Sequence, residues 1–221
     1  MFDITKLALK IPNFLTHEEC DRLISEFEQR KNEAQLENSF NYKTNKQANS
    51  SFKVVSLEPY TSNFNFIKQK TKTAIDIWID YLNQPNAFFT TLLKNALQFS
   101  HNYRIMEYKT GASIHPHSDH NMGTYGSISF NLNKDYKGGE FKFFNGKHTV
   151  SLGKGDALIF PADYFWVHEV SPVTEGVRYS LNSFLCRYPE EIKQNANYLG
   201  GLLYEDCLKT TPSEELLGPY N

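Results

Sequence analysis

The chain has 221 residues, of which 40% are hydrophobic, and a formal net charge of −2. This length can bury one sizeable core, so we expect a single domain over residues 1–221. The near-neutral charge gives no reason to expect a nucleic-acid partner, and no apolar run reaches membrane-spanning length. The N-terminus also lacks the layout of a signal peptide. From the charge and the apolar pattern together, we expect neither a nucleic-acid nor a membrane partner.

The three cysteines, Cys20, Cys186 and Cys207, are too few and too scattered for a disulfide framework. None has the paired spacing of a zinc site built from thiolates. This usage predicts a reducing, cytoplasmic location.

The N-terminal part, about residues 1–99, contains two segments with helical periodicity. Thr16 and Glu19 form a capping box, which predicts a helix start there. Apolar residues recur at helical spacing again from Asn65 to Leu82, and Asn83–Asn86 ends that segment before a shorter apolar one at 87–99. We expect these helices to pack against one sheet.

Residues 31–51 are polar and rich in Asn, Lys and Ser. This composition predicts a loop, which is either a lid over a functional site or a surface decoration.

From about Gln98 the apolar residues alternate with a period of two, which predicts strands. Turn signals, including Asn145-Gly146, a type I′ hairpin signal, separate these segments. We expect strands at Asn102–Lys109, Ser113–Asp119, Gly126–Leu132, Glu140–Phe144, His148–Leu152, Asp156–Phe160, Phe165–Val170 and Arg178–Arg187. Short strands in this number predict an α+β, mainly β fold: a double-sheet jelly roll over about 100–187, followed by a tail at 188–221.

His117 and Asp119 are two residues apart, so on an extended strand their side chains share one face. Two histidines and one carboxylate on one side of the metal are typical of non-heme Fe(II) oxygenases. His168, in a later strand, is the candidate for the missing ligand. A carboxylate ligand at Asp119 favours hydroxylation, because halide-transferring iron sites leave that position open. His115 and His120 are expected to lie outside the ligand set.

Arg178 and Ser180 share one face of the last predicted strand. A cation facing inward on a core strand needs an anion, and the distal carboxylate of 2-oxoglutarate would supply it. Tyr108, before the predicted strand that carries His117, could donate a hydrogen bond to the same acid. The alternative for Arg178 is a surface salt bridge, and for Tyr108 a place at the rim.

An ordered set of motifs resembles the prolyl 4-hydroxylase family of 2-oxoglutarate- and Fe(II)-dependent dioxygenases. The set comprises Tyr108-x-x-Gly111, His117-x-Asp119, Gly138-Gly139-Glu140, Gly155–Phe160 and His168-x-x-x-Pro172-Val173-x-x-Gly176-x-Arg178. The wording DYKGGEF and HEVSPVTEGVRYS is especially similar to bacterial and phage PKHD-type hydroxylases. The resemblance implies a double-stranded β-helix with Fe(II) at His117, Asp119 and His168.

The resemblance also implies that Arg178, with Tyr108 assisting, binds the C5 carboxylate of 2-oxoglutarate. It implies O2 as the oxidant, ascorbate as a candidate reductant, and the cytoplasm of a bacterial or phage-infected host cell. Three positions depart from the family pattern: Arg178 stands where many members have Lys, Phe141 where a Thr is frequent, and an Arg is missing near Thr124. These departures leave open whether the hydroxylated substrate is a prolyl residue, another peptidyl residue, a free amino acid or another small molecule.

Two other functions fit part of the pattern. A cupin-like protein would bind a metal without oxygenase activity. A nucleic-acid demethylase on the same barrel would carry a second Arg six residues after the first, and Phe184 occupies that position.

Overall fold

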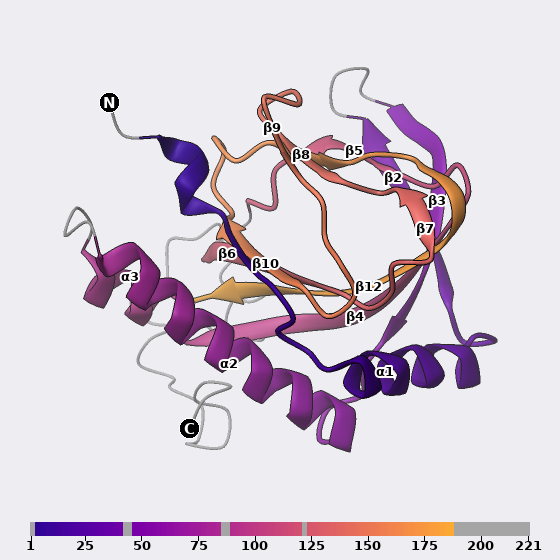
Figure 1. Cartoon of the computed structure of the whole chain (residues 1–221), viewed down its shortest axis with the longest axis horizontal. Coiled ribbons are helices and arrows are strands. Elements are labelled where there is room, and N and C mark those ends of the chain that lie inside the picture. The colour runs from indigo at the N-terminus through magenta and orange to yellow at the C-terminus, as the bar shows by residue number, and fades with distance from the viewer. Residues whose placement is uncertain (1–2, 42–45, 85–88, 121–122, 188–221) are drawn as a thin grey trace, which may run out of the picture.

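The computed structural model describes residues 3–41, 46–84, 89–120 and 123–187, which form a mainly β structure with helices along one side (Figure 1). The helices are η1 (Ile4–Leu7), α1 (His17–Gln29), α2 (Ser62–Asn83) and α3 (Thr90–Ala96). The strands are β1 (Leu9–Ile11), β2 (Gln35–Asn41), β3 (Lys46–Ser56), β4 (Phe99–Lys109), β5 (Ile114–His117), β6 (Thr124–Asn131), β7 (Tyr136–Gly138), β8 (Phe141–Phe143), β9 (His148–Val150), β10 (Ala157–Pro161), β11 (His168–Val170) and β12 (Val173–Cys186). The predicted tail lies outside the described residues.

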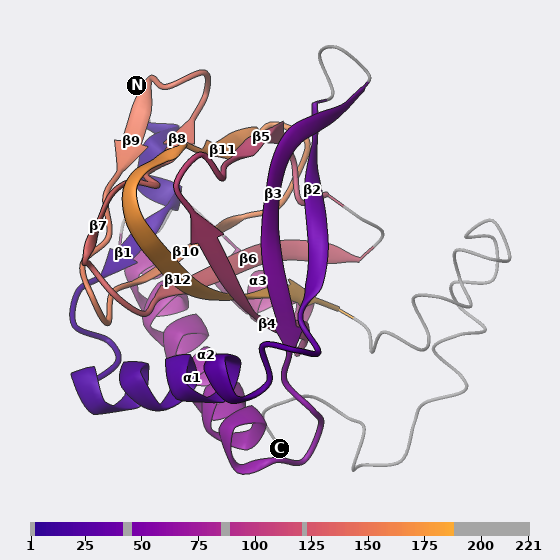
Figure 2. The ribbon, with the colours of Figure 1, turned by 90° about the vertical axis from the view of Figure 1, so that its right-hand side faces the viewer.

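The described strands form two antiparallel sheets, which Figure 2 shows from the side. The larger sheet has the order β1-β10-β6-β12-β4-β3-β2, with β7 paired to β12, and the smaller has the order β5-β11-β8-β9. This arrangement is consistent with a double-sheet jelly roll. Each strand predicted between Asn102 and Arg187 has a counterpart in it.

The outer face of the larger sheet and the helices share one hydrophobic core. Leu23 of α1, Trp78 of α2, and Ile128, Ile159 and Leu181 of the sheet all belong to this buried cluster. The Trp78 indole also donates a hydrogen bond to the carbonyl of Leu7. Because the helices cover its outer face, the larger sheet has its inner face toward the smaller sheet.

Among the described residues, no helix combines the length and apolar character needed to cross a membrane.

The capping box predicted at the start of α1 is present. The Thr16 hydroxyl accepts a hydrogen bond from the Glu19 amide, and the Glu19 carboxylate accepts one from the Thr16 amide. Asn145 and Gly146, between β8 and β9, both have positive φ angles, as a type I′ turn requires. The capping box and the turn were therefore both predicted correctly from local sequence signals.

The loop predicted over residues 31–51 is wrong, because most of the described part of this range belongs to the β2–β3 hairpin. The strands are held by backbone hydrogen bonds, which a polar composition does not prevent. Their apolar anchors, Phe52 and Val54, lie at the end of β3 just beyond the polar stretch, and both are buried. β2 also lies beside β5, since the His115 amide donates to the Ser39 hydroxyl. The hairpin thus borders the strand that carries His117.

Asp156 ties the N-terminal segment to the start of β10. Its carboxylate accepts hydrogen bonds from the amides of Asn13 and Gly153 and pairs with Lys10 at 2.9 Å. Burial alone would raise the pKa of Asp156, but Lys10 and the two amides hold this pKa below its ordinary value. The ionised carboxylate is therefore the form that the fold stabilises.

We expect Asp156→Ala to lower the free energy of unfolding by about 3 kcal/mol at neutral pH, because two amides lose a charged acceptor. The matched control, Asp80→Ala at an exposed position of α2, should change it by less than about 0.5 kcal/mol. Because the pKa is lower in the folded state, the contribution exists at neutral pH and fades as pH falls below about 4. Urea unfolding of both variants and the parent at several pH values measures this. A loss that is equally large at pH 3 would contradict the assigned role of the ionised carboxylate.

Candidate metal and co-substrate site

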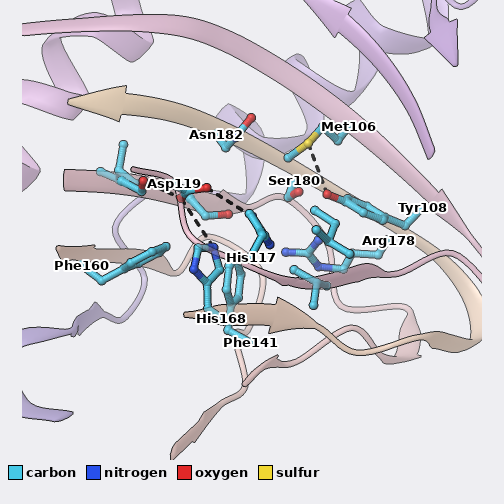
Figure 3. Close-up of a pocket in the computed structure, with 15 residues that line it drawn as sticks. Met106, Tyr108, His117, Asp119, Phe141, Phe160, His168, Arg178, Ser180 and Asn182 are labelled. Atoms are coloured by element: carbon cyan, nitrogen blue, oxygen red, sulfur yellow. Dashed lines mark hydrogen bonds and ion pairs between the residues drawn. The ribbon is translucent and has the colours of Figure 1, made fainter. Parts of the chain in front are cut away.

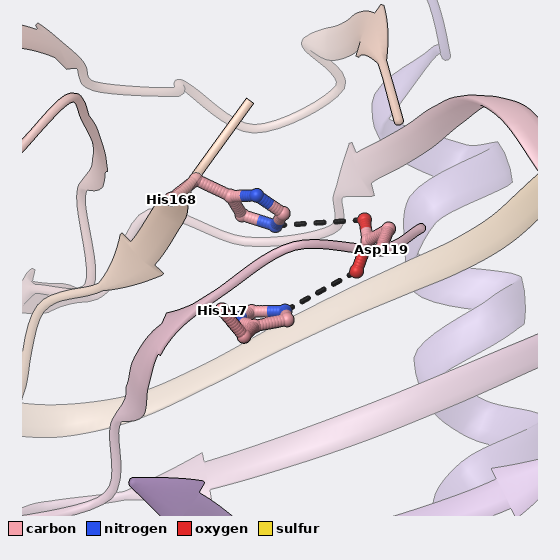
Figure 4. A group of neighbouring side chains, drawn as sticks. All are labelled: His117, Asp119 and His168. Atoms are coloured by element: carbon pink, nitrogen blue, oxygen red, sulfur yellow. Dashed lines mark ion pairs between the residues drawn. The ribbon is translucent and has the colours of Figure 1, made fainter. Parts of the chain in front are cut away.

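His117, Asp119 and His168 converge between the two sheets (Figure 4). His117 ends β5 and His168 begins β11, and these two residues face each other in the antiparallel register. The Nε2 atoms of His117 and His168 lie 3.2 and 3.5 Å from the two carboxylate oxygens of Asp119. One potential ligand atom from each residue lies within 4.8 Å of the others. The two-His, one-carboxylate set that the sequence predicted is therefore assembled at one point.

Both imidazoles are oriented through their other ring nitrogen. The Nδ1 atoms of His117 and His168 lie 2.8 and 3.0 Å from the carbonyl oxygens of His115 and Trp166. A carbonyl oxygen only accepts, so Nδ1 carries the proton in each ring and donates it. This leaves the Nε2 lone pairs for a metal ion.

The protonation states of the group also suit a metal. Burial lowers the pKa of His168 to about 4, so this imidazole is neutral at neutral pH. Burial alone would raise the pKa of Asp119, but the two histidines and Ser127 hold it well below its ordinary value. For His117, burial favours the neutral ring, but the carboxylate of Asp119 outweighs it and raises the pKa. Metal binding to such a site releases a proton.

Sequence reasoning missed Ser127, whose hydroxyl donates a 2.6 Å hydrogen bond to Asp119. Ser127 comes from β6, on the sheet opposite the two histidines. Its alternation with the buried Ile128 was the available signal, but the approach of β6 to Asp119 from the opposite sheet is not readable from local sequence.

Arg178 lies in the same cavity as the metal group (Figure 3). The cavity has a volume of about 40 Å³ and is lined by residues from both sheets. The Arg178 side chain is only 1% exposed, yet none of its three nitrogens has a hydrogen-bond partner among the described residues. The Tyr108 and Phe141 rings flank the guanidinium at 4.9 and 5.7 Å. Aromatic faces attract a cation but leave its N–H donors unsatisfied.

Two neighbours of Arg178 complete this end of the cavity. Ser180 is fully buried, and its hydroxyl also lacks a partner in the described structure. Tyr108 is fully buried as well, and its hydroxyl contacts the sulfur of Met106 at 3.2 Å. Burial raises the pKa of Tyr108, so its hydroxyl stays protonated and can donate. The three residues that the sequence predicted for the co-substrate thus lie together at one end of the cavity.

The second glycine of the Gly138-Gly139 motif lies against the side chain of Arg178. It has a φ of 70°, and a Cβ there would lie 2.8 Å from Cδ of Arg178. A larger residue would therefore displace the guanidinium from its place in the cavity.

The remaining histidines of the motif lie outside the group of three. His115 takes part through its backbone, which orients His117 and contacts Ser39. His120 is exposed, and its ring packs on Tyr164 at a centroid distance of 3.6 Å.

Comparisons with known proteins agree with this geometry. Residues 103–186 match the family model of the 2OG-Fe(II) oxygenase superfamily. A PKHD-type hydroxylase of Idiomarina loihiensis is 30% identical over 123 residues, which cover 51% of this chain and 53% of that protein. The chain thus spans about half the length of the curated relative that it matches.

Solved structures share the fold at low sequence identity. A Pseudomonas putida prolyl-4-hydroxylase aligns with a TM-score of 0.58 at 20% identity, covering 82% of this chain and 92% of that one. A prolyl hydroxylase from Trichoplax adhaerens, in complex with a hypoxia inducible factor peptide fragment, aligns with a TM-score of 0.61 at 17% identity, covering 88% and 87%. The family model, the hydroxylase relative and these shared folds together support a resemblance of this chain to prolyl 4-hydroxylase-like 2OG-Fe(II) oxygenases.

Proposed function

We propose that this protein is an Fe(II)- and 2-oxoglutarate-dependent dioxygenase that hydroxylates an unactivated C–H bond of a peptidyl or free amino acid. The observation that carries the proposal is the buried guanidinium of Arg178, which has no hydrogen-bond partner in the described part of the chain and shares a cavity with the His-Asp-His group. A buried cation without a partner is costly, so it implies a bound anion.

His117, Asp119 and His168 would hold Fe(II), because two imidazoles and a carboxylate suit that ion and leave positions for other ligands. When bound, the iron supplies oxidation chemistry in which O2 and 2-oxoglutarate yield succinate, CO2 and one oxygen atom for the substrate. The protein's part is to bind, to orient and to exclude water.

Arg178 would bind the C5 carboxylate of 2-oxoglutarate with its planar fork, and Ser180 and Tyr108 would each donate a hydrogen bond to it. Ser127 would hold Asp119 in its ligating orientation, and the carbonyls of His115 and Trp166 would hold the two imidazoles. The co-substrate would thus be anchored at one end by the protein and at the other by the iron.

The proposal includes a reducing cytoplasmic setting with ascorbate as a candidate reductant. Cys20 supports this setting, since its thiol is buried and free in the described structure. A peptide substrate has support from the Trichoplax neighbour, whose structure holds a peptide fragment.

Replacing His117 should abolish both metal binding and catalysis. We expect His117→Ala to weaken Fe(II) binding by more than the roughly 100-fold that loss of an outer-shell partner causes. Succinate formation from 2-oxoglutarate should then fall below detection. Anaerobic metal titration and succinate measurement by NMR test this, with exposed His17→Ala as the matched control. Undiminished Fe(II) binding by His117→Ala would contradict the assigned ligand.

Replacing Arg178 should separate co-substrate binding from metal binding. We expect Arg178→Met to raise the Kd for 2-oxoglutarate, with Mn(II) present, by about 100-fold, which corresponds to roughly 3 kcal/mol. Calorimetric titration measures this, with Arg22→Met at an exposed position of α1 as the control.

The ligand-free Arg178→Met protein should unfold at the same or a higher temperature than the parent, because it loses an uncompensated buried charge. Added 2-oxoglutarate and Mn(II) should stabilise the parent but not this variant. If both proteins bound 2-oxoglutarate equally, or neither bound it, the cupin-like alternative would be favoured.

A further inference from the structure

Three polar residues form a transverse row across the larger sheet, beside the metal group. In the strand register Asn182 of β12 faces Ser129 of β6 on one side and Arg104 of β4 on the other. Ser129 and Asn182 line the cavity that contains the metal group, and Figure 3 shows Asn182 on the same strand as Ser180. Arg104 extends the row away from that cavity, toward β2.

Each member of the row has a buried polar atom without a hydrogen-bond partner in the described structure: Ser129 Oγ, Asn182 Oδ1 and Arg104 Nε. Such atoms are rare in folded proteins and need an explanation. Asn131, also on β6, shows that the same sheet can satisfy a buried amide. Its nitrogen donates to the carbonyl of Asn133, and its oxygen accepts from the Tyr136 hydroxyl.

The row is too long to serve 2-oxoglutarate alone. That acid would be bound between Arg178 and the metal group, where Arg178, Ser180 and Tyr108 already offer donors for its far carboxylate. Arg104 does not line this cavity and lies one strand beyond Asn182. A second molecule is therefore needed to reach the whole row.

The charge along the row selects the chemistry of that molecule. One terminal nitrogen of Arg104 lies 2.9 and 3.1 Å from the two carboxylate oxygens of Glu37, so this cation already has a counter-ion. What remains is an N–H donor at Arg104, an acceptor at Asn182 and a hydroxyl at Ser129. An uncharged group with one N–H and one carbonyl matches this set better than an anion does.

The Phe184 ring provides an apolar surface next to the row. The Arg104 guanidinium lies 5.8 Å from the ring centroid, and the His101 ring lies 5.6 Å from it. A substrate held by its amide at the row could therefore place apolar atoms against Phe184.

We propose that Ser129, Asn182 and Arg104 form the subsite that binds the primary substrate, through an uncharged amide next to the carbon to be hydroxylated. This inference rests on the proposed function, and it narrows the substrate to molecules that carry a neutral amide, as opposed to amino acids with both ends charged.

The test uses the full chain loaded with Mn(II) and 2-oxoglutarate in the absence of O2, so that binding is measured without turnover. The probes are N-acetyl amino acid amides, which are neutral at both ends, and the corresponding free amino acids. We expect the parent to bind at least one blocked amide more tightly than its free counterpart. We expect Asn182→Leu and Ser129→Ala each to weaken that binding by about tenfold, the value of one hydrogen bond.

Ser151→Ala, on an exposed serine after β9, is the matched control and should bind the amide as the parent does. In Asn182→Leu the unfolding temperature should not fall, since the variant removes an unsatisfied buried oxygen, so weaker binding there would not reflect misfolding.

Tighter binding of free amino acids, no binding of any blocked amide, or equal amide binding by parent, Asn182→Leu and Ser129→Ala would overturn the proposed subsite. Failure of the parent to bind 2-oxoglutarate in the same titration would instead refute the proposed function, so the two failures are distinguishable.

Discussion

The charge of Arg178 has to be balanced inside the protein, and the structure provides no hydrogen-bond acceptor for it among the described residues. The side chain is enclosed by the rings of Tyr108 and Phe141 and by the backbone at Gly139, each of which leaves room for the guanidinium without satisfying it. Burying a cation in this way opposes folding, and only the rest of the core makes it tolerable. This buried charge, on the longest of the described strands, is the basis of the proposed anion site.

Side chains of β12 alternate between the hydrophobic core and the cavity, so one face of the strand contributes to stability and the other to the candidate site. Leu181 and Leu185 face the helices and belong to the large hydrophobic core, whereas Arg178, Ser180 and Asn182 lie on the cavity face. The helices thus provide the burial that holds the strand, while its inner face remains polar. This division explains how one strand can carry several unsatisfied polar atoms inside a stable domain.

Local pattern was sufficient for the features that repeat along the chain. The two-residue spacing of His117 and Asp119, and the inward-facing charge at Arg178, could be predicted from strand periodicity. The position of His168 followed from its order in the chain, and the register opposite His117 accounts for its place in the site.

Features that depend on pairing between distant segments were not predictable in this way. Much of the β2–β3 hairpin is polar, because backbone hydrogen bonds hold the two strands together there. Its buried apolar residues, Phe52 and Val54, come only after the polar stretch. Ser127 reaches Asp119 only because β6, in the larger sheet, lies close to the residues that follow β5 of the smaller sheet. Asn182 meets Arg104 only through the β4–β12 register. Each of these contacts joins segments whose local sequences carry no mark of the partner.

The most direct measurement is a crystal structure of the protein grown without O2 in the presence of Mn(II) and 2-oxoglutarate. The assigned roles predict the metal bonded to Nε2 of His117, Nε2 of His168 and the carboxylate of Asp119, with the far carboxylate of the acid against the Arg178 guanidinium. A metal bound elsewhere, or an acid whose far carboxylate leaves Arg178 unpaired, would contradict them.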